Sequence, residues 1–458
     1  MQDRRATAEA AVRWPSCVLP FRGDQPGQSR QECGMTKPNL VIVMTDQQRM
    51  DSLACYGNCF TATPETSRMA SRGVCFDTAM TPWPVCTPAR ATAWTGTYPS
   101  RHRVIDNLYG VDNAFATHSN IPLTVFDRLK SAGYTTAHFG KWHLGEAHPP
   151  FFDHWEESFN SRRGHWIDGK LDGEYRPDRA TDAATRWLSE QRGQDIPFAM
   201  VLSFYPPHDP YSAPRRFYEP YRGKGVPFAG YYAAVSALDH NLGRVRDAIE
   251  AAGLRDNTVV IYFSDHGDTF WYRREGEHKF VCTDDSLRIP MIVEGPGIAP
   301  GSRCAAPVGI QDLTPTMLEL AGVPLPPELQ GRSLVPLLRG EAPADWRAGH
   351  YVQNITHISG FHQRAWRTDD WKLIVSDNGD HELYNLALDP EEELNVFLTP
   401  RDDGGFERFK HYPDFAPTID ELASDMLAEA KRLEDDEGIA LIGEMRSGLA
   451  GRLAAARA

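Results

Sequence analysis

A lone cysteine stands where a helix is expected to begin. In the stretch PVCTPARATAWTG, Cys86 comes two residues before Pro88 and four before Arg90. Proline is tolerated in the first turn of a helix, and Gly96 is suited to end one. Free N–H groups at a helix N-terminus favour an anion. Cys86 therefore fits a low-pKa thiolate nucleophile, the precursor of a different nucleophile, or a small buried structural cysteine.

Residue types that bind metals or transfer protons follow four apolar runs. The runs are NLVIVMT (39–45), YTTAHF (134–139), PFAMVLSFY (197–205) and NTVVIYF (257–263). They are typical of buried strands in a mostly parallel sheet, and ligands of such sheets bind beyond the carboxyl ends of the strands. We therefore expect one site that is built from the side chains past these ends, namely Asp46, Gln47, Lys141, His143, His208, Asp265 and His266.

The elements around these runs indicate an α/β fold. TVFDRLKSAG and YYAAVSALDHNLGRVRDAIEAAG read as helices between strands, and short strands joined by turns follow residue 345. Helical, charge-rich sequence begins near Pro417, and a proline- and glycine-rich stretch at 324–346 is the candidate linker. We predict a disordered extension (1–35), a catalytic domain with a large mixed sheet (36–345) and a smaller C-terminal α+β subdomain with an antiparallel sheet and terminal helices (346–458).

Composition excludes several classes of protein. A net charge of −14 over 458 residues argues against nucleic-acid or anionic-membrane binding, because both need a basic surface. Eight cysteines in so long a chain do not make a disulfide scaffold, and although Cys55 and Cys59 are close, no second pair has zinc-site spacing. The N-terminus lacks the apolar core of a signal peptide, and no run is long enough to span a bilayer. We expect a cytoplasmic protein without a membrane partner.

Five segments in order resemble the type I formylglycine-dependent sulfatase family of the alkaline phosphatase superfamily. CTPAR matches the family signature C-x-P-x-R, and GYTTAHFGKWHLG is similar to its second signature. TDQQR and SDHGD resemble the two metal-binding segments, and RTDDWKLIV with ELYNLALDPEEELN resembles the C-terminal domain. The resemblance covers about residues 37–400. It implies an alkaline-phosphatase-like fold and oxidation of Cys86 to Cα-formylglycine (3-oxoalanine) by a formylglycine-generating enzyme.

The resemblance also implies one divalent metal. Its ligands would be Asp46, Gln47, Asp265, His266 and an oxygen of the modified Cys86. Calcium is the family's usual ion, and the histidine also suits Mn²⁺ or Mg²⁺. Many sulfatases carry a second aspartate where this chain has Gln47, so this site has one negative charge fewer. The same Asp-Gln pair resembles the phosphonate monoester hydrolase and choline sulfatase branches.

The remaining roles that the resemblance implies concern the sulfate ester. Arg90, Lys141 and Lys279 would hold the anion while the formylglycine hydrate attacks sulfur. His208, helped by Lys279, would protonate the leaving alcohol, and His143 would act as base. Asn107 resembles a substrate-contacting asparagine of the phosphonate hydrolase branch. Cys86, Arg90, Lys141, His143, His208 and Lys279 are thus the predicted catalytic residues, and Asn107, Arg90, Lys141, His208 and Lys279 the predicted substrate contacts.

Two other functions compete with a sulfatase. A phosphonate monoester or phosphodiester hydrolase of the same superfamily also uses formylglycine, but its branch carries neutral hydroxyl residues where this chain has Lys141 and His143. A non-catalytic binding protein is disfavoured because every expected catalytic position is filled. Segments 105–120, 146–180 and 267–283 are rich in Trp, Tyr, Arg and His, which suits a sugar or an aryl group. We expect a small-molecule or oligosaccharide sulfate ester, and the oligomeric state is left open.

Overall fold

The computed structural model describes residues 37–113, 123–160, 164–270, 278–355, 360–402 and 405–457. The chain from Lys37 onward is one compact unit. The extension that we predicted over residues 1–35 lies outside the described residues. Within the described ranges, no helix is long and apolar enough to cross a membrane.

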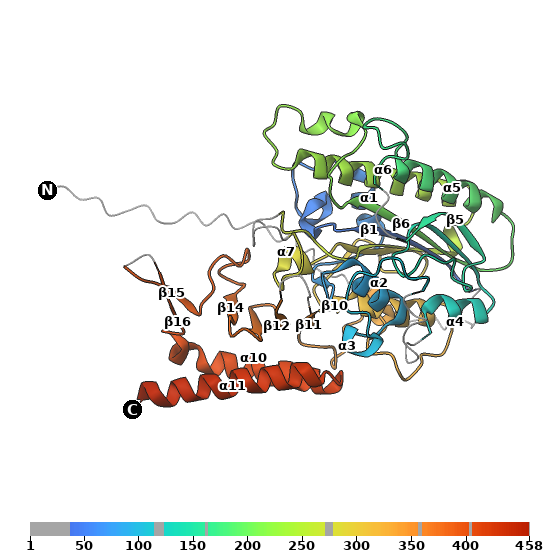
Figure 1. Ribbon diagram of the computed structural model, residues 1–458. Helices are drawn as coiled ribbons and strands as arrows, with labels where there is room; N and C mark the ends of the chain where they lie inside the picture. The colour runs from blue at the N-terminus through green and yellow to red at the C-terminus, as the bar shows by residue number, and fades with distance from the viewer. Residues whose placement is uncertain are drawn as a thin grey trace, which may run out of the picture. The chain divides into compact units, whose positions relative to one another are not determined.

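A mixed eight-stranded sheet forms the centre of this unit (Figure 1). Its order is β5 (His154–Phe159), β4 (Thr135–Lys141), β6 (Phe198–Pro207), β1 (Asn39–Asp46), β7 (Thr258–Ser264), β8 (Met291–Glu294), β2 (Val74–Phe76) and β9 (Ser302–Cys304). The first five strands run parallel to one another. β8 runs antiparallel to both β7 and β2. The sheet confirms the predicted mostly parallel architecture, and β1, β4, β6 and β7 coincide with the four apolar runs to within two residues.

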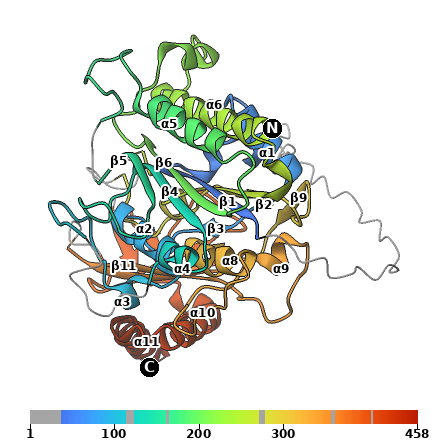
Figure 2. The same cartoon turned by 90° about the vertical axis from the view of Figure 1, so that its right-hand side faces the viewer.

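Helices cover both faces of this sheet, as Figure 2 shows. Successive side chains of a strand point to opposite faces. Leu40, Ile42 and Met44 of β1 therefore pack with α2 (Cys86–Thr95), α4 (Val125–Ser131) and α8 (Leu313–Leu320). Val41 and Val43 pack on the other face with α5 (Arg176–Glu190) and α6 (Ala229–Ala251). α1 (Pro64–Arg72) joins the second layer and α9 (Val335–Leu338) the first.

The proline-rich stretch 324–346 is not a linker, so that prediction was wrong. Leu334 and Leu338 are fully buried in the core beneath the sheet. Gln330 accepts a hydrogen bond from the Tyr98 N–H and donates one to the Leu433 carbonyl, and so joins the catalytic region to the C-terminal helices. Prolines and glycines shape this path, but its leucines provide the burial that fixes it.

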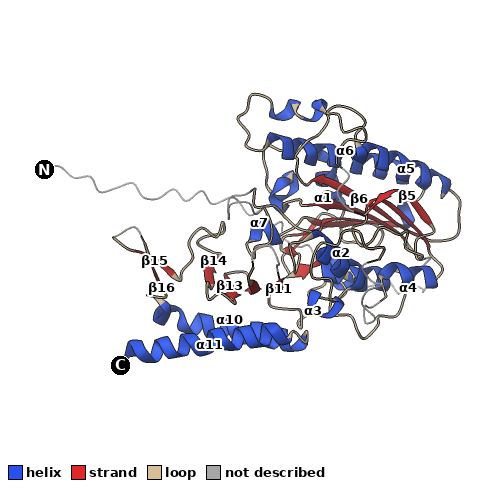
Figure 3. Cartoon of the chain, in the orientation of Figure 1, coloured by secondary structure: helices blue, strands red, loops and turns tan. Residues whose placement is uncertain are grey.

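The C-terminal part holds a four-stranded antiparallel sheet of β11 (His350–Ile355), β12 (His362–Arg367), β13 (Trp371–Ser376) and β14 (Glu382–Asn385). The long helices α10 (Tyr412–Arg432) and α11 (Asp436–Arg457) lie side by side and pack on one face of it (Figure 3). The other face packs against Met80, Cys282 and Leu287 of the catalytic region. The predicted antiparallel sheet and terminal helices are thus confirmed, whereas the boundary at 345/346 stays a prediction.

The smaller elements connect these layers. They are the strand pairs β3 (Ala79–Met80) with β10 (Val308–Gly309) and β15 (Leu398–Pro400) with β16 (Phe406–Arg408), the short helices α3 (Pro99–His102) and α7 (Asp284–Leu287), and 3₁₀ turns at Met50–Ser52, Ala54–Tyr56, Arg215–Phe217, Glu219–Tyr221, Arg255–Asn257 and Ile310–Asp312.

Candidate active site

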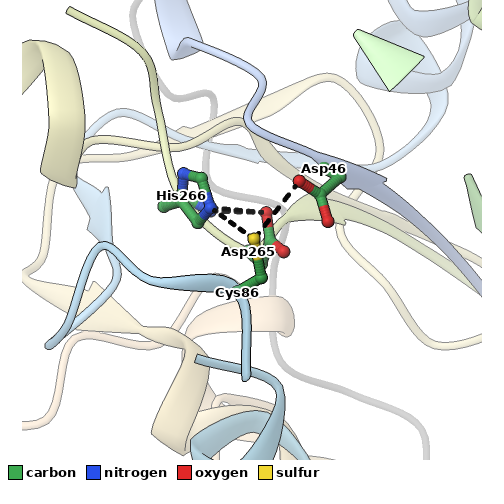
Figure 4. Close-up of side chains that lie close together, drawn as sticks. All are labelled: Asp46, Cys86, Asp265 and His266. Atoms are coloured by element: carbon green, nitrogen blue, oxygen red, sulfur yellow. Dashed lines mark hydrogen bonds and ion pairs between the residues drawn. The ribbon is translucent and has the colours of Figure 1, made fainter. Parts of the chain in front are cut away.

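The polar residues at the strand ends lie in one buried cluster. Asp46 ends β1, Lys141 ends β4, His208 follows β6, and Asp265 with His266 follows β7. Each of these side chains is at most 1% exposed. Figure 4 shows Asp46, Asp265 and His266 converging on Cys86. Parallel strands bring their carboxyl ends to the same edge of a sheet, and residues more than two hundred positions apart thereby become neighbours.

Cys86 is the first residue of α2, as the sequence predicts. The helix ends at Gly96, whose φ of 67° lies in the left-handed region that glycine readily adopts. The Cys86 Sγ lies 3.3 Å from His266 Nε2, 3.3 Å from Lys279 Nζ and 3.6 Å from Asp46 Oδ1. Burial raises the pKa of the thiol, but the charges of Lys141 and Lys279 outweigh it and hold that pKa well below its usual value. The surroundings of Cys86 thus stabilise a negative charge at this position.

Four ligand atoms could hold a metal ion. One atom each from Asp46, Cys86, Asp265 and His266 lies within 4.8 Å of the others. The Nδ1 of His266 is 2.8 Å from the Gly267 carbonyl, which fixes a hydrogen on Nδ1, so that the neutral ring directs its Nε2 lone pair toward Cys86. Burial and the adjacent Asp46 raise the pKa of Asp265 to about 6. Two carboxylates that oppose each other's ionisation, beside an imidazole lone pair, fit a divalent cation.

Asp46 forms ion pairs with two cationic side chains. Its Oδ2 accepts hydrogen bonds from Arg90 Nη2 at 2.9 Å and from Lys141 Nζ at 2.5 Å. Arg90 Nε also lies 3.3 Å from Asp265 Oδ2. Burial and the Cys86 thiol raise the pKa of Asp46, but Lys141 and Arg90 reverse this and hold it below its usual value. Asp46 is therefore ionised, and fixed positive charge lies directly beside the nucleophile position.

Lys279 links Cys86 to His208. Its Nζ lies 3.3 Å from Cys86 Sγ, 3.0 Å from Gln47 Oε1 and 3.2 Å from His208 Nε2. Burial lowers the pKa of Lys279, but the negative charges of Cys86 and Asp46 raise it above its usual value. An ammonium and an imidazole nitrogen thus share one side of Cys86.

The two polar atoms of the Gln47 side chain contact different groups. Its Oε1 accepts from Lys279, while its Nε2 donates to Asp268 Oδ2 at 2.7 Å and lies 3.0 Å from His278 Nδ1. Its role as a metal ligand stays a prediction. The Tyr211 hydroxyl also donates to Asp268 Oδ2, at 2.5 Å. The sequence reasoning missed Asp268, His278 and Tyr211, although the SDHGD segment includes Asp268 and so carried a signal for that residue.

His143 and Asn107 occupy different parts of the site. Burial and the charge of Lys141 lower the pKa of His143 to about 4. The Cys86 thiol is close to this ring without a well-aligned bond, and neither ring nitrogen has a hydrogen-bond partner among the described residues. Asn107 Oδ1 accepts from the N–H and the hydroxyl of Thr87, both at 3.1 Å. Asn107 therefore braces the start of α2, and its contact with substrate stays a prediction.

Comparison with known proteins agrees with this geometry. A model of the Sulfatase family matches residues 38–323, and a model described as "N-sulphoglucosamine sulphohydrolase, C-terminal" matches residues 272–410. An ulvan-active sulfatase of Formosa agariphila is 30% identical over 408 residues, covering 80% of this chain and 78% of that protein. An N-acetylglucosamine-6-O-sulfatase of Bacteroides thetaiotaomicron is 27% identical over 475 residues, covering 79% and 83%.

Solved structures share the fold. A putative sulfatase from Bacteroides fragilis superposes with a TM-score of 0.75 at 25% identity, covering 91% of this chain and all of that one. A protein solved with its substrate D-glucosamine-2-N,6-O-disulfate gives 0.74 at 25% identity, with 88% and 99% covered. The chain belongs to the sulfatase family of the alkaline phosphatase superfamily. It is a sulfuric ester hydrolase, which cleaves sulfate esters to alcohol and inorganic sulfate.

Proposed function

We propose that this sulfatase hydrolyses O-sulfated carbohydrates, with a nucleophile derived from Cys86 and with one divalent cation. The observation that carries the proposal is the position of Cys86. It begins α2, and its Sγ lies within 3.6 Å of atoms of Asp46, His266 and Lys279. A structural cysteine has no need of a lysine and a carboxylate at that distance.

The nucleophile would arise by oxidation of Cys86 to formylglycine, which a formylglycine-generating enzyme would carry out during maturation. The hydrated aldehyde supplies an oxygen nucleophile and can release sulfate as the carbonyl reforms. His143 supports this chemistry as the base. Its pKa of about 4 keeps the ring neutral at pH 7, and its unpartnered nitrogens are available for a proton near residue 86.

The divalent cation would be held by Asp46, Asp265 and His266 together with an oxygen on residue 86. Its positive charge would supply Lewis-acid stabilisation of negative oxygen at this position. We propose Ca²⁺, because two carboxylates give hard oxygen ligands, with Mn²⁺ or Mg²⁺ as the alternatives that the histidine accommodates. Gln47 is the further proposed ligand, through an amide oxygen that now accepts from Lys279.

The sulfate group would be bound by fixed cations. Arg90 and Lys141 lie on the Asp46 side of Cys86, and Lys279 lies on the His208 side. A sulfate monoester is a permanent monoanion, so charges that need no protonation suit it. His208, with Lys279 beside its Nε2, is the proposed acid that donates a proton to the leaving oxygen.

A carbohydrate substrate is supported by two observations. The Tyr109 ring, 54% exposed, lies 5.6 Å from the ring of the buried His143 and so offers an exposed aromatic surface beside the site. Several relatives also carry carbohydrate names, among them the ulvan-active and N-acetylglucosamine-6-O-sulfatases. Parts of the three segments that we predicted to set specificity, at 114–120, 161–163 and 271–277, lie outside the described residues.

A phosphonate monoester hydrolase is the weaker alternative. One such enzyme, from Agrobacterium radiobacter, superposes with a TM-score of 0.67 at 21% identity, which is a likeness of fold alone. Lys141 and His143, both buried beside Cys86, favour the sulfatase reading.

The test combines mass spectrometry with a substrate panel. The chain is expressed with a formylglycine-generating enzyme, the peptide across residue 86 is weighed, and Cys86→Ala is the matched control. Turnover is then measured as sulfate release from glucosamine 6-sulfate, sulfated oligosaccharides and 4-nitrophenyl sulfate, and as phenol release from a phenyl phosphonate monoester. We expect the aldehyde in the peptide and the highest kcat/KM on a sugar sulfate. An intact thiol in an active preparation would refute the nucleophile, and preferred turnover of the phosphonate would refute the substrate class.

A further inference from the structure

Asp209, the residue after the proposed acid His208, contacts the Nδ1 edge of the His208 ring. His208 Nδ1 lies 3.1 Å from the backbone carbonyl oxygen of Asp209 and 2.8 Å from the Asp209 carboxylate Oδ1. The opposite nitrogen, Nε2, is 3.2 Å from Lys279 Nζ. The imidazole therefore has a carbonyl acceptor at one edge, with a carboxylate at ion-pair distance beside it that is not aligned for a hydrogen bond to Nδ1, and an ammonium donor at the other edge.

This environment selects one tautomer of neutral His208. A nitrogen that faces a carbonyl and a carboxylate must carry hydrogen, and one that faces an ammonium must offer a lone pair. The hydrogen-bond network thus assigns the Nδ1–H form. Tyr205 packs against the ring at 4.9 Å between centroids and 31° between planes. That contact restrains the plane of the ring but does not distinguish Nδ1 from Nε2. The contacts of Asp209 with Nδ1 therefore determine which nitrogen faces Lys279.

We propose that Asp209 is a positioning residue for proton transfer to the leaving alcohol. The inference rests on the proposed role of His208 as the acid. In the substrate complex, the proton on Nε2 passes to the ester oxygen as the S–O bond breaks, and the electron pair of that bond stays on the same oxygen. The imidazole is left neutral with its remaining hydrogen on Nδ1. Asp209 faces Nδ1–H before and after transfer: its negative charge favours the imidazolium that the acid step requires, and its position keeps Nε2 as the nitrogen that faces the substrate.

Asp209 can be changed without opening the core. Its side chain is 35% exposed, whereas His208 is 1% exposed. His278 Nδ1 lies 3.8 Å from Asp209 Oδ1, so the carboxylate also adjoins a second imidazole. Asp209→Asn removes the charge at nearly constant volume, and its amide can present either a donor or an acceptor to Nδ1. Asp182→Asn is the control, because Asp182 is an exposed carboxylate on α5 that pairs with Arg244 and lies outside the site.

The experiment compares two leaving groups. Nitrophenolate is a weak base that departs without a proton, whereas the alkoxide of a sugar needs one. We therefore measure kcat/KM on 4-nitrophenyl sulfate and on a sugar sulfate for the wild type, Asp209→Asn, Asp209→Glu, Asp182→Asn and His208→Asn. Each preparation is normalised to its formylglycine content by peptide mass.

We expect Asp209→Asn to lower kcat/KM on the sugar sulfate by about 10- to 100-fold, mainly in kcat, with little change on nitrophenyl sulfate. Asp209→Glu should recover part of the loss, and Asp182→Asn should resemble the wild type. An equal loss on both substrates would reduce Asp209 to a structural residue and overturn the inference. If His208→Asn discriminates between the substrates and Asp209→Asn does not, the inference falls and the proposed acid stands. If His208→Asn does not discriminate either, both fall.

Discussion

Replacing Lys279 by methionine separates catalysis from stability in this protein. The ammonium is buried and contacts three groups, namely Cys86 Sγ, Gln47 Oε1 and His208 Nε2. In the proposed mechanism it binds the sulfate and assists departure of the alcohol. Methionine has a similar length but carries neither charge nor hydrogen-bond donors, so it removes these contributions with a small change in volume.

The expected loss of activity follows from the number of lost interactions. Removing one preorganised donor from a site of this kind lowers kcat by about 100- to 1000-fold, or about 3–4 kcal/mol of transition-state stabilisation. Stability should respond differently. Asp46 and Asp265 are balanced by Arg90 and Lys141 as well as by Lys279, so no buried carboxylate loses its last cation. The loss of the Gln47 hydrogen bond should cost about 1 kcal/mol.

The assay is kcat on a sugar sulfate together with the free energy of unfolding from denaturant titration. Arg90→Met is the comparison variant, because it removes a partner from both Asp46 and Asp265 and should cost about 3–5 kcal/mol of stability. If Lys279→Met kept its kcat within tenfold, or if it lost as much stability as Arg90→Met, the reasoning about charge at this site would be wrong.

Three further predictions concern the metal, acid stability and a buried ion pair. Dialysis against a chelator should abolish sulfate release and lower Tm, and Ca²⁺ at about 100 times its Kd should restore activity together with about 2.7 kcal/mol of stability; activity that survives metal-free dialysis contradicts this. Burial lowers the pKa of His165 to about 4, so the unfolded chain takes up this proton near pH 6.5 before the native protein does, and about 3 kcal/mol should be lost as pH falls from 6.5 to 4. Unfolding titrations of His165→Asn across this range should show a shallower slope, and an unchanged slope assigns the acid sensitivity elsewhere. Lys372→Met should cost about 3–5 kcal/mol in urea unfolding because it removes the ammonium that pairs with the buried Glu392 and one of the cations that pair with Asp284, which keeps Arg367, whereas Lys130→Met at an exposed pair should cost at most about 1 kcal/mol; similar losses in both variants would contradict this.

Much of the fold could be predicted from the sequence, because buried strands are recognisable as continuous apolar runs. Runs such as NLVIVMT are apolar at every position, which is what a strand covered on both faces requires, and β1, β4, β6 and β7 begin and end near the predicted residues. The same logic failed at 324–346. There, prolines and glycines suggested a linker, but Leu334 and Leu338, four residues apart at helix α9, pack into the core. Composition describes the stiffness of a segment and not the surface on which it packs.

By itself, the sequence determined the family signature, the helix that begins at Cys86 and the polar side chains that follow the strand ends, since each depends on residues near one another in the chain. Only the tertiary structure decided which groups face each other. Gln47 and Asp268 are 221 positions apart, and nothing local indicates that the amide nitrogen faces the aspartate while the oxygen faces Lys279. The bracing of α2 by Asn107 and the pairing of His208 with Asp209 likewise depend on orientation. Orientation is set by packing and by hydrogen bonds across the sheet edge, where donors and acceptors from distant strands must satisfy one another away from water.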